Sequence, residues 1–316
     1  MNWFLASLIA LLFWSGSDLF SKIGCCGEKD KTAHLKMVVA VGVVMGLHAA
    51  YEIFLGGVEI SLHVIWTYLP VSLLYIVSMA IGYVGLRYIE LSVSSPICNS
   101  SGALVAVLTV IFGGMAALRE LSPLVLAAVV LVCVGVVGLG VVESREDDDL
   151  RARRQEHANR KYAKSWLAIA LPVGYCLLDA AGTFADSLVL QKLNEDSANV
   201  AYELTFLAAG ICCLIYLLIR REKFTFKEEL PKYIGATCET VGQFFYIQAI
   251  ADEAHVMYSA PIIAAYCVLS TVWGRVFLRE KLSWKHYLMI GLRHRLPRHL
   301  RRVISHAPGF GSVHFA

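Results

Sequence analysis

Charged residues and polar stretches are scarce in this sequence. Asp, Glu, Lys and Arg make up 17% of its 316 residues, while hydrophobic residues make up 57%. The mean hydropathy of +0.61 is far outside the usual balance of a soluble domain. No polar stretch between the hydrophobic segments is long enough to bury a core of its own, so we expect one membrane-embedded unit. The formal net charge of +3 gives no support to nucleic-acid binding.

Motifs for catalysis and metal binding are missing as well. The nine cysteines form no CxxC pair, and most fall inside apolar runs, where a thiol packs as a small hydrophobe. The sequence has no HExxH, no Gly-rich phosphate loop, no serine nucleophile elbow and no DxxD-like cluster. These absences disfavour an enzyme and predict neither a metal nor a cofactor.

What the sequence has is a series of apolar segments long enough to cross a bilayer as helices. They cover residues 3–21, 37–55, 64–86, 93–117, 122–142, 166–190, 200–219, 232–250 and 256–278. The first has no basic leader and no cleavage site, so it is a span and not a secretory signal. After residue 292 the chain becomes basic, with five Arg and two Pro. We therefore predict an all-α integral membrane protein with nine clear spans, a degenerate or missing tenth helix, and a basic non-spanning tail at 293–316.

Lys and Arg are unevenly distributed among the loops. Loops one, three, five, seven and nine carry 21 of them, whereas loops two, four, six and eight carry only Arg119 and Lys192. Because basic loops stay in the cytoplasm, residues 143–165 are predicted to be a cytoplasmic linker, and the N-terminus to lie outside. That linker is either a solvated connection or a contact for regulation or the lipid surface.

The chain contains an internal repeat. The segment ALRELS at 117–122 follows the fourth span, and FLREKLS at 277–283 follows the ninth. Trp3 aligns with Trp166, and an aspartate within the membrane follows each, Asp18 and Asp179. We therefore expect two five-helix repeats, 1–142 and 166–292, of which the second is inverted because each holds an odd number of spans.

The two five-helix halves and the (L)RE-(x)-LS ending of the fourth and ninth spans resemble the drug/metabolite transporter superfamily, specifically EamA-type transporters. The resemblance covers about residues 3–292. It implies ten helices, a central substrate cavity and the export or exchange of small metabolites. The sequence departs from the family in the tail that replaces the tenth helix. Members of the family are also commonly drawn with a cytoplasmic N-terminus, opposite to the orientation that the charges predict here.

Acidic side chains inside spans are candidates for function, because a carboxylate at the bilayer centre costs roughly 2.5–3.5 kcal/mol. Asp179 and Glu239 lie several residues inside their helices with no cation within one turn. They could bind and release a proton during transport, or hydrogen-bond between helices. Asp18 lies closer to a span end and could pair with Lys22 at i+4. The remaining polar candidates in or near spans are His48, Glu52, Asp186 and Glu203, of which the three acids could be simply solvated.

Polar and aromatic residues accompany these acids. Glu239, Gln243 and Tyr246 follow i, i+4 and i+7, so they share one face of the eighth span. Aromatic residues of three other spans could complete a pocket for an amphipathic solute, or could simply pack and anchor: Trp14, Tyr75, Tyr83 and Tyr175. Asn99 begins a weak helical stretch that ends at Gly102, and Pro261 stands opposite Ser101 in the repeat. Interrupted helices at matched positions point to the binding site of a transporter, although a membrane proline is often only a kink.

The function that these features favour is gradient-driven export or exchange of a small metabolite or drug-like solute across the cell membrane. A non-transporting membrane receptor or assembly protein is the alternative, and an integral-membrane enzyme is disfavoured. The expected partners are the lipid bilayer and a small-molecule substrate, and the sequence leaves homodimer formation open. The identity of the solute does not follow from the sequence.

Overall fold

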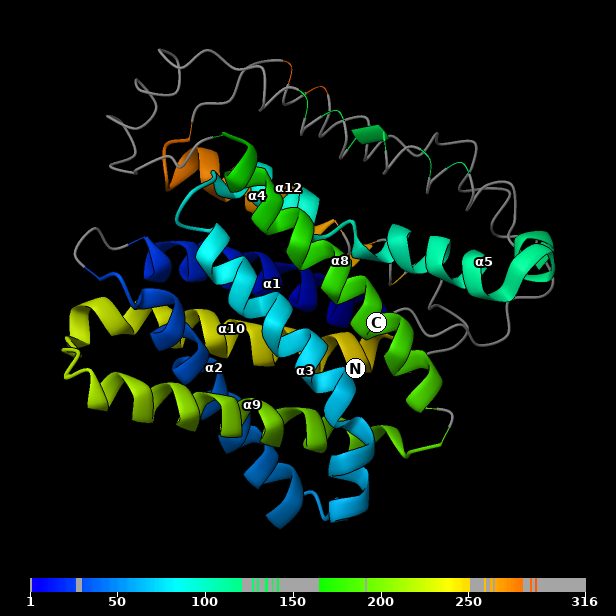
Figure 1. Ribbon diagram of the computed structural model, residues 1–316, viewed down its shortest axis with the longest axis horizontal. Helices are drawn as coiled ribbons and strands as arrows, with labels where there is room; N and C mark the ends of the chain where they lie inside the picture. Colours follow the sequence, from blue (N-terminus) through cyan, green and yellow to red (C-terminus); the bar gives the residue numbers. More distant parts are fainter. Residues whose placement is uncertain are drawn as a thin grey trace.

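Helices make up the regular structure of this protein in the computed structural model (Figure 1). It describes residues 2–26, 30–120, 165–190, 192–250 and 265–280, together with positions 127, 130, 134, 135, 138, 141, 259, 262, 263, 285 and 288. The helices are α1 (Trp3–Cys25), α2 (Ala33–Phe54), α3 (Leu62–Gly85), α4 (Leu91–Cys98), α5 (Ser101–Glu120), α8 (Ser165–Val189), α9 (Glu195–Ile219), α10 (Phe226–Ile250) and α12 (Tyr266–Val276).

Five helical segments in the described residues are long and apolar enough to cross a membrane. They are α1, α2, α3, the run Leu91–Phe112 and α9. The all-α, multi-pass membrane architecture expected from the sequence is therefore confirmed. The count of nine spans stays a prediction, and the fifth span, the linker and the basic tail fall almost wholly outside the described residues.

Some helix starts carry polar caps that hydropathy does not detect. The Asn2 side chain accepts a hydrogen bond from the backbone N–H of Phe4 at 3.0 Å. Asn194 caps α9 in the same way, accepting from the N–H groups of Asp196 at 3.0 Å and Ser197 at 3.2 Å. Such caps satisfy N–H groups that have no partner within the helix. α9 therefore begins at Glu195, five residues before the predicted span. Hydropathy does not detect this first turn because its residues are polar.

The fourth predicted span is broken. α4 ends at Cys98 and α5 begins at Ser101, with Asn99 and Ser100 between them. Pro96 lies inside α4 and has no N–H to donate, which weakens the helical hydrogen bonding around it. The interruption lies where the sequence Asn99 to Gly102 predicts a weak point.

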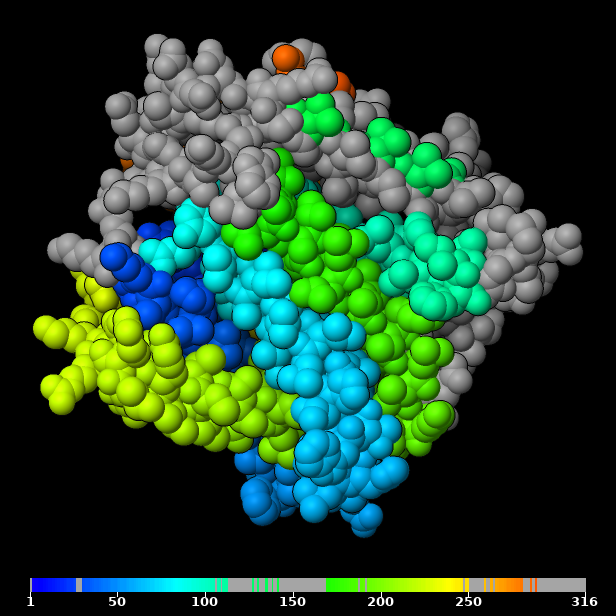
Figure 2. Space-filling view, viewed as in Figure 1, coloured from blue at the N-terminus to red at the C-terminus, as the bar shows by residue number. Residues whose placement is uncertain are grey.

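Three helix pairs form the body of the protein: α1 packs on α10, α2 on α9, and α3 on α8. Figure 1 shows α3 and α8 running side by side, and Figure 2 shows their atoms in contact along one face. α2 and α9 approach closely at Gly42, where an added Cβ would lie 2.6 Å from the carbonyl oxygen of Phe206 and 3.0 Å from Cα of Gly210. Small residues allow such close packing of membrane helices.

The basic loops gather at one end of the bundle. Arg87, after α3, donates to the carbonyl of Lys31 before α2 at 2.9 Å. Lys36 donates to the carbonyl of Lys223, between α9 and α10, at 2.6 Å. Loops one, three and seven therefore share one end, as the alternation of charge requires. The side of the membrane that this end faces stays a prediction.

Candidate functional site

Asp18 connects three helices. It lies near the middle of α1, two turns before the helix ends at Cys25. Its Oδ2 accepts hydrogen bonds from the Ser95 hydroxyl of α4 at 2.5 Å and from the Ser270 hydroxyl of α12 at 2.6 Å. α1 continues four residues past the predicted apolar segment, so Asp18 lies two turns inside the helix. Hydroxyl donors satisfy the oxygen but leave its negative charge in place.

Lys22, the expected i+4 partner of Asp18, binds elsewhere. Its side chain is fully buried, and its ammonium donates to the backbone carbonyls of Leu86 and Ile89. These carbonyls follow the C-terminal end of α3, where a cation is favoured by the helix dipole and by unpaired carbonyl groups. The predicted Asp18–Lys22 pair is therefore wrong, and Lys22 closes the end of α3 instead.

Asp179 and Glu239 lie near the middle of α8 and α10, and both are half-buried. The hydroxyl of Ser17 lies close enough to Glu239 to act on its carboxyl, and that of Ser101 close enough to act on Asp179. The charges of Asp18 and Asp179 both act on Glu239, so both carboxyls lie within electrostatic range of it. We refer to Asp18, Asp179 and Glu239 as the acidic centre. In the part of the chain that the structure describes, its hydrogen-bond partners are serine hydroxyls.

Aromatic rings surround part of the acidic centre. The Trp14 ring lies 5.1 Å from that of Tyr246 and 5.5 Å from that of Tyr266, between centroids. Trp273 of α12 donates from its indole nitrogen to the Ser15 hydroxyl at 3.1 Å. Tyr266 interacts electrostatically with both Asp18 and Glu239. The face of α1 that carries Asp18 therefore also meets aromatic side chains of α10 and α12.

The other predicted residues are distributed over the same helices. Tyr75 donates its hydroxyl to Oγ1 of Thr183 at 3.1 Å, and the ring of Tyr175 packs against Gly82. Tyr83 is buried in the main apolar core, at 7% exposure. Asn99 donates its side-chain amide to the carbonyl of Ser95 at 3.1 Å.

Gln243 lies half-buried on the face of α10 that carries Glu239. Pro261 lies outside the described residues. Solute binding by the predicted residues stays a prediction.

Sequence reasoning missed the small hydroxyl residues of the acidic centre. Ser95 and Ser270 hydrogen-bond with Asp18, and Ser17 and Ser101 act on the carboxyls of Glu239 and Asp179. Serine is common in membrane helices as a packing residue, so its identity alone is a weak signal. The stretch Ser94-Ser95-Pro96 was the most informative signal, because hydroxyl groups stand there beside a helix break.

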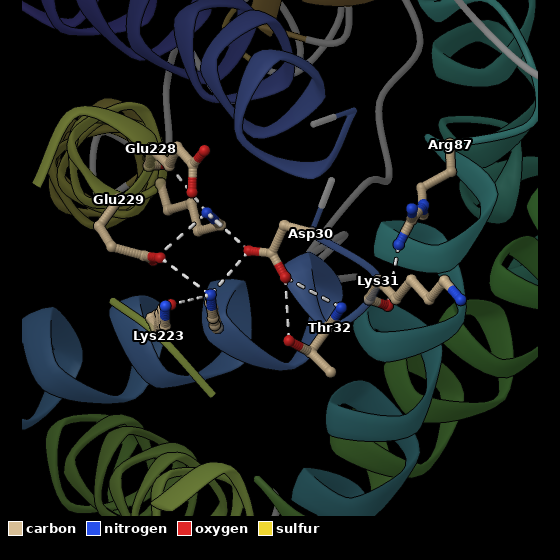
Figure 3. A network of polar contacts seen from close by, with 9 residues as sticks. Asp30, Lys31, Thr32, Arg87, Lys223, Glu228 and Glu229 are labelled. Atoms are coloured by element: carbon tan, nitrogen blue, oxygen red, sulfur yellow. Dashed lines mark hydrogen bonds and ion pairs between the residues drawn. The ribbon is translucent and has the colours of Figure 1, made fainter. Parts of the chain in front are cut away.

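A buried ion-pair network lies at the basic end of the bundle (Figure 3). Lys36 reaches Asp30 at 2.9 Å and Glu229 at 3.4 Å. Lys232 reaches Glu229 at 3.3 Å and Asp30 at 3.9 Å. We call these four residues the ion-pair network; it ties the loop after α1 to the starts of α2 and α10. Burial raises the pKa of the Asp30 carboxyl, but hydrogen bonds from Lys36 and Thr32 and the charge of Lys36 bring that pKa below its ordinary value.

A second polar cluster joins α2 to α9, beyond the close approach at Gly42. His48 Nδ1 lies 2.8 Å from Oε1 of Glu203, and His48 Nε2 lies 3.7 Å from Oε1 of Glu52. Glu203 is buried, at 3% exposure. The interpretation of Glu203 as a solvated interfacial acid is therefore wrong, because α9 presents it to α2 and not to water.

The repeated motif after the ninth span also has a local role. Glu280 accepts hydrogen bonds from the backbone N–H groups of Leu91 at 2.8 Å and Ser92 at 3.0 Å, and from the Ser92 hydroxyl at 2.6 Å. Arg279, immediately before it, has a positive φ of 56°, an unusual conformation for a residue with a side chain. The turn directs the Glu280 carboxylate to the N-terminus of α4, where negative charge is favoured.

Comparisons with known proteins support the fold and leave the function open. No family model matches the chain, and no curated protein matches it. A solved structure described only as "Crystal structure of protein" is similar, with a TM-score of 0.56 and 15% sequence identity. The match covers 95% of this chain and 97% of that one. At this identity the likeness is one of fold alone, so the chain is a multi-helix membrane protein whose architecture also occurs in a solved structure.

Proposed function

We propose that this protein is a gradient-driven transporter of a small solute, of the kind found in the drug/metabolite transporter superfamily. The observation that carries the proposal is the acidic centre, in which Asp18 accepts hydrogen bonds from two hydroxyl groups and the charges of Asp18 and Asp179 act on Glu239. Acids inside a membrane bundle are expensive to maintain and typically mark ion, proton or substrate pathways. A structural role alone would be served as well by neutral side chains.

In the part of the chain that the structure describes, the lysines near these helices bind other groups. Lys22 binds carbonyl groups, and Lys36 and Lys232 belong to the ion-pair network. The aromatic rings of Trp14, Tyr246 and Tyr266 offer the apolar surface that small-molecule sites combine with a few polar groups. This combination suits an amphipathic solute whose movement is coupled to a proton.

Matched contacts in the two halves support the proposed inverted repeat. Trp14 precedes Asp18 by four residues, as Tyr175 precedes Asp179. Trp14 packs against Gly242 of α10, and Tyr175 packs against Gly82 of α3. In the proposed repeat, α1, α2 and α3 correspond to α8, α9 and α10. Under this correspondence the pair α1–α10 becomes α8–α3, and α2–α9 becomes α9–α2, so the same three helix pairs are obtained. An inverted repeat of this kind underlies alternating access in many transporters.

The helix break supports the same interpretation. α5 begins at Ser101, five residues after the proline of the sequence Ser94-Ser95-Pro96. Ser259-Ala260-Pro261 precedes the start of α12 at Tyr266 by the same five residues. Each half therefore has a proline five residues before the start of a helix, which supports a matched break in the two halves.

The test is uptake by proteoliposomes that contain the purified protein, with pooled amino acids, sugars and cationic drugs and an imposed pH gradient. We expect at least one pool to be taken up by the wild-type protein. Asp179→Asn and Glu239→Gln should remove the pH dependence of uptake while leaving folding intact. Glu59→Gln is the matched control, because Glu59 is exposed. Failure of every pool in the wild-type protein would favour a receptor or assembly role instead.

A further inference from the structure

Polar side chains line the contact between α3 and α8, beyond the acidic centre. They recur at i, i+4 and i+7 on both helices, as Tyr68, Ser72 and Tyr75 on α3 and Asp179, Thr183 and Asp186 on α8. Tyr75 donates a hydrogen bond to Thr183, and the phenol of Tyr68 lies close enough to Asp186 to act on its carboxyl. We call this stripe the α3–α8 seam. It leads from the C-terminal part of α8 to the acidic centre.

Asp186 is the unexpected member of the seam. The sequence suggested a solvated acid near a span end, but the side chain is only 8% exposed, because α3 covers it. Its Oδ1 is buried and has no hydrogen-bond partner among the described residues. The hydroxyl of Ser72, at 0% exposure, also has no partner in that part of the chain. Buried polar atoms are nearly always bonded to protein or ordered water, so both atoms have capacity for a small polar ligand.

The groups that face Asp186 come from three helices. Tyr68 and Tyr75 face it from α3, Glu195 acts on it from α9, and Tyr246 interacts with it from α10. These are phenols and a second carboxyl, so the described surroundings supply no cation. Tyr75 interacts electrostatically with both Asp186 and Asp179. Its hydroxyl donates to Thr183, which lies between the two acids on the same face of α8.

We propose that the α3–α8 seam is a proton path and that Asp186 is its entry station. Asp186 and Asp179 are seven residues apart on one helix, about 10 Å along its axis, which is too far for direct transfer. Hydronium that enters beside Asp186 gives its proton to the carboxylate, forming a carboxylic acid and water. The proton then passes to water held by the Ser72 and Thr183 hydroxyls, and from that water to the carboxylate of Asp179. No electrons move, and each carboxylate is restored when its proton leaves.

The role of this path in transport rests on the proposed function, because a proton path to Asp179 serves proton-coupled transport. The protonation of Asp186 itself can be measured without any solute. Infrared difference spectra of the reconstituted protein between acid and neutral pH, in water and in deuterium oxide, report protonated carboxyl groups. We expect a carboxylic C=O band that shifts in deuterium oxide and is lost in Asp186→Asn. Asp196→Asn, an exposed site at the start of α9, should keep the band.

A second variant tests the path between the two acids. Ser72→Ala should slow deuterium exchange at the Asp179 carboxyl, identified by its loss in Asp179→Asn, without removing the Asp186 band. Ser7→Ala is the matched control, because Ser7 is equally buried but bonds a carbonyl of its own helix at 2.8 Å. A sealed, structural Asp186 would give no band that responds to pH or to deuterium, and that result overturns the proposal.

Proton flux completes the test and separates the two proposals. With a transported solute, Asp186→Asn should lose the internal pH change that accompanies uptake while solute exchange continues. Unchanged proton flux in this variant would refute the proton path and leave the transporter proposal intact. If no solute pool is transported but the infrared bands behave as expected, the transporter proposal fails, whereas the proposed protonation of Asp186 is supported.

Discussion

Removal of the Lys36 ammonium should destabilise the protein strongly, because this group holds two buried carboxylates. Lys36 is 3% exposed and bonds Asp30 at 2.9 Å, Glu229 at 3.4 Å and the Lys223 carbonyl at 2.6 Å. Breaking a buried ion pair by removal of one partner typically costs about 3–5 kcal/mol, since the other charge stays buried. The ammonium also lies 5.1 Å from the ring of Phe224, which adds roughly 0.5–1 kcal/mol. Lys232 offsets part of the loss, so we expect Lys36→Met to cost about 3 kcal/mol.

The same network predicts how stability responds to acid. Because the pKa of Asp30 is lower in the folded protein than its ordinary value of 3.8, ionisation of Asp30 stabilises the fold. That stabilisation is present in full above the ordinary pKa and is lost as the pH falls through the lower folded value. The acid-sensitive part of the stability should therefore lie below pH 4, and it should shrink in Lys36→Met, which removes the main cause of the low pKa.

Thermal unfolding of the protein in detergent, followed by tryptophan fluorescence across pH, measures both effects. Lys31→Met is the matched control, because the same change is made five residues earlier at an exposed side chain. We expect the control to lie within about 0.5 kcal/mol of wild type. The double variant Lys36→Met/Asp30→Asn should be less destabilised than the sum of its parts. Equal unfolding temperatures of Lys36→Met and Lys31→Met would refute the reasoning.

Two further predictions concern packing and topology. Gly42→Ala should separate α2 from α9 and lower stability by about 1–3 kcal/mol, because the new Cβ meets backbone atoms of Phe206 and Gly210. Gly102→Ala, where nothing lies within 4 Å, should be tolerated, and equal Tm values for the two variants would contradict this account. A cysteine at Ala152, placed in a variant without reactive native cysteines, should resist membrane-impermeant thiol reagents in intact cells; rapid labelling would reverse the predicted orientation.

The sequence predicted those parts of the fold that depend on local composition. Apolar length located the helices, and the stretch from Asn99 to Gly102 located the break between α4 and α5. The sequence also singled out Asp18, Asp179 and Glu239, because an acid inside an apolar run is conspicuous. That these acids come from distant parts of the chain to one place depends on helix packing, which no local pattern specifies.

Errors arose where a partner from another helix decides the role of a side chain. Asp18 and Lys22 are a plausible pair by spacing, yet carbonyl groups following α3 take the lysine. Asp186 and Glu203 stand near the ends of apolar segments, so position alone suggested solvation. Both are buried, because α3 covers Asp186 and α2 covers Glu203. Sequence distance from a span end is therefore a poor guide when the neighbouring helix extends beyond it.

The short helix α4 is held differently at its two ends. Glu280 fixes its N-terminus through two backbone N–H groups, while its C-terminus meets the break at Asn99 and Ser100. This eight-residue helix is therefore anchored at its N-terminus by Glu280 and interrupted at its C-terminus. Ser95 lies near the interrupted end, so a tilt of α4 about its N-terminus would part the Ser95 hydroxyl from Asp18, 2.5 Å away.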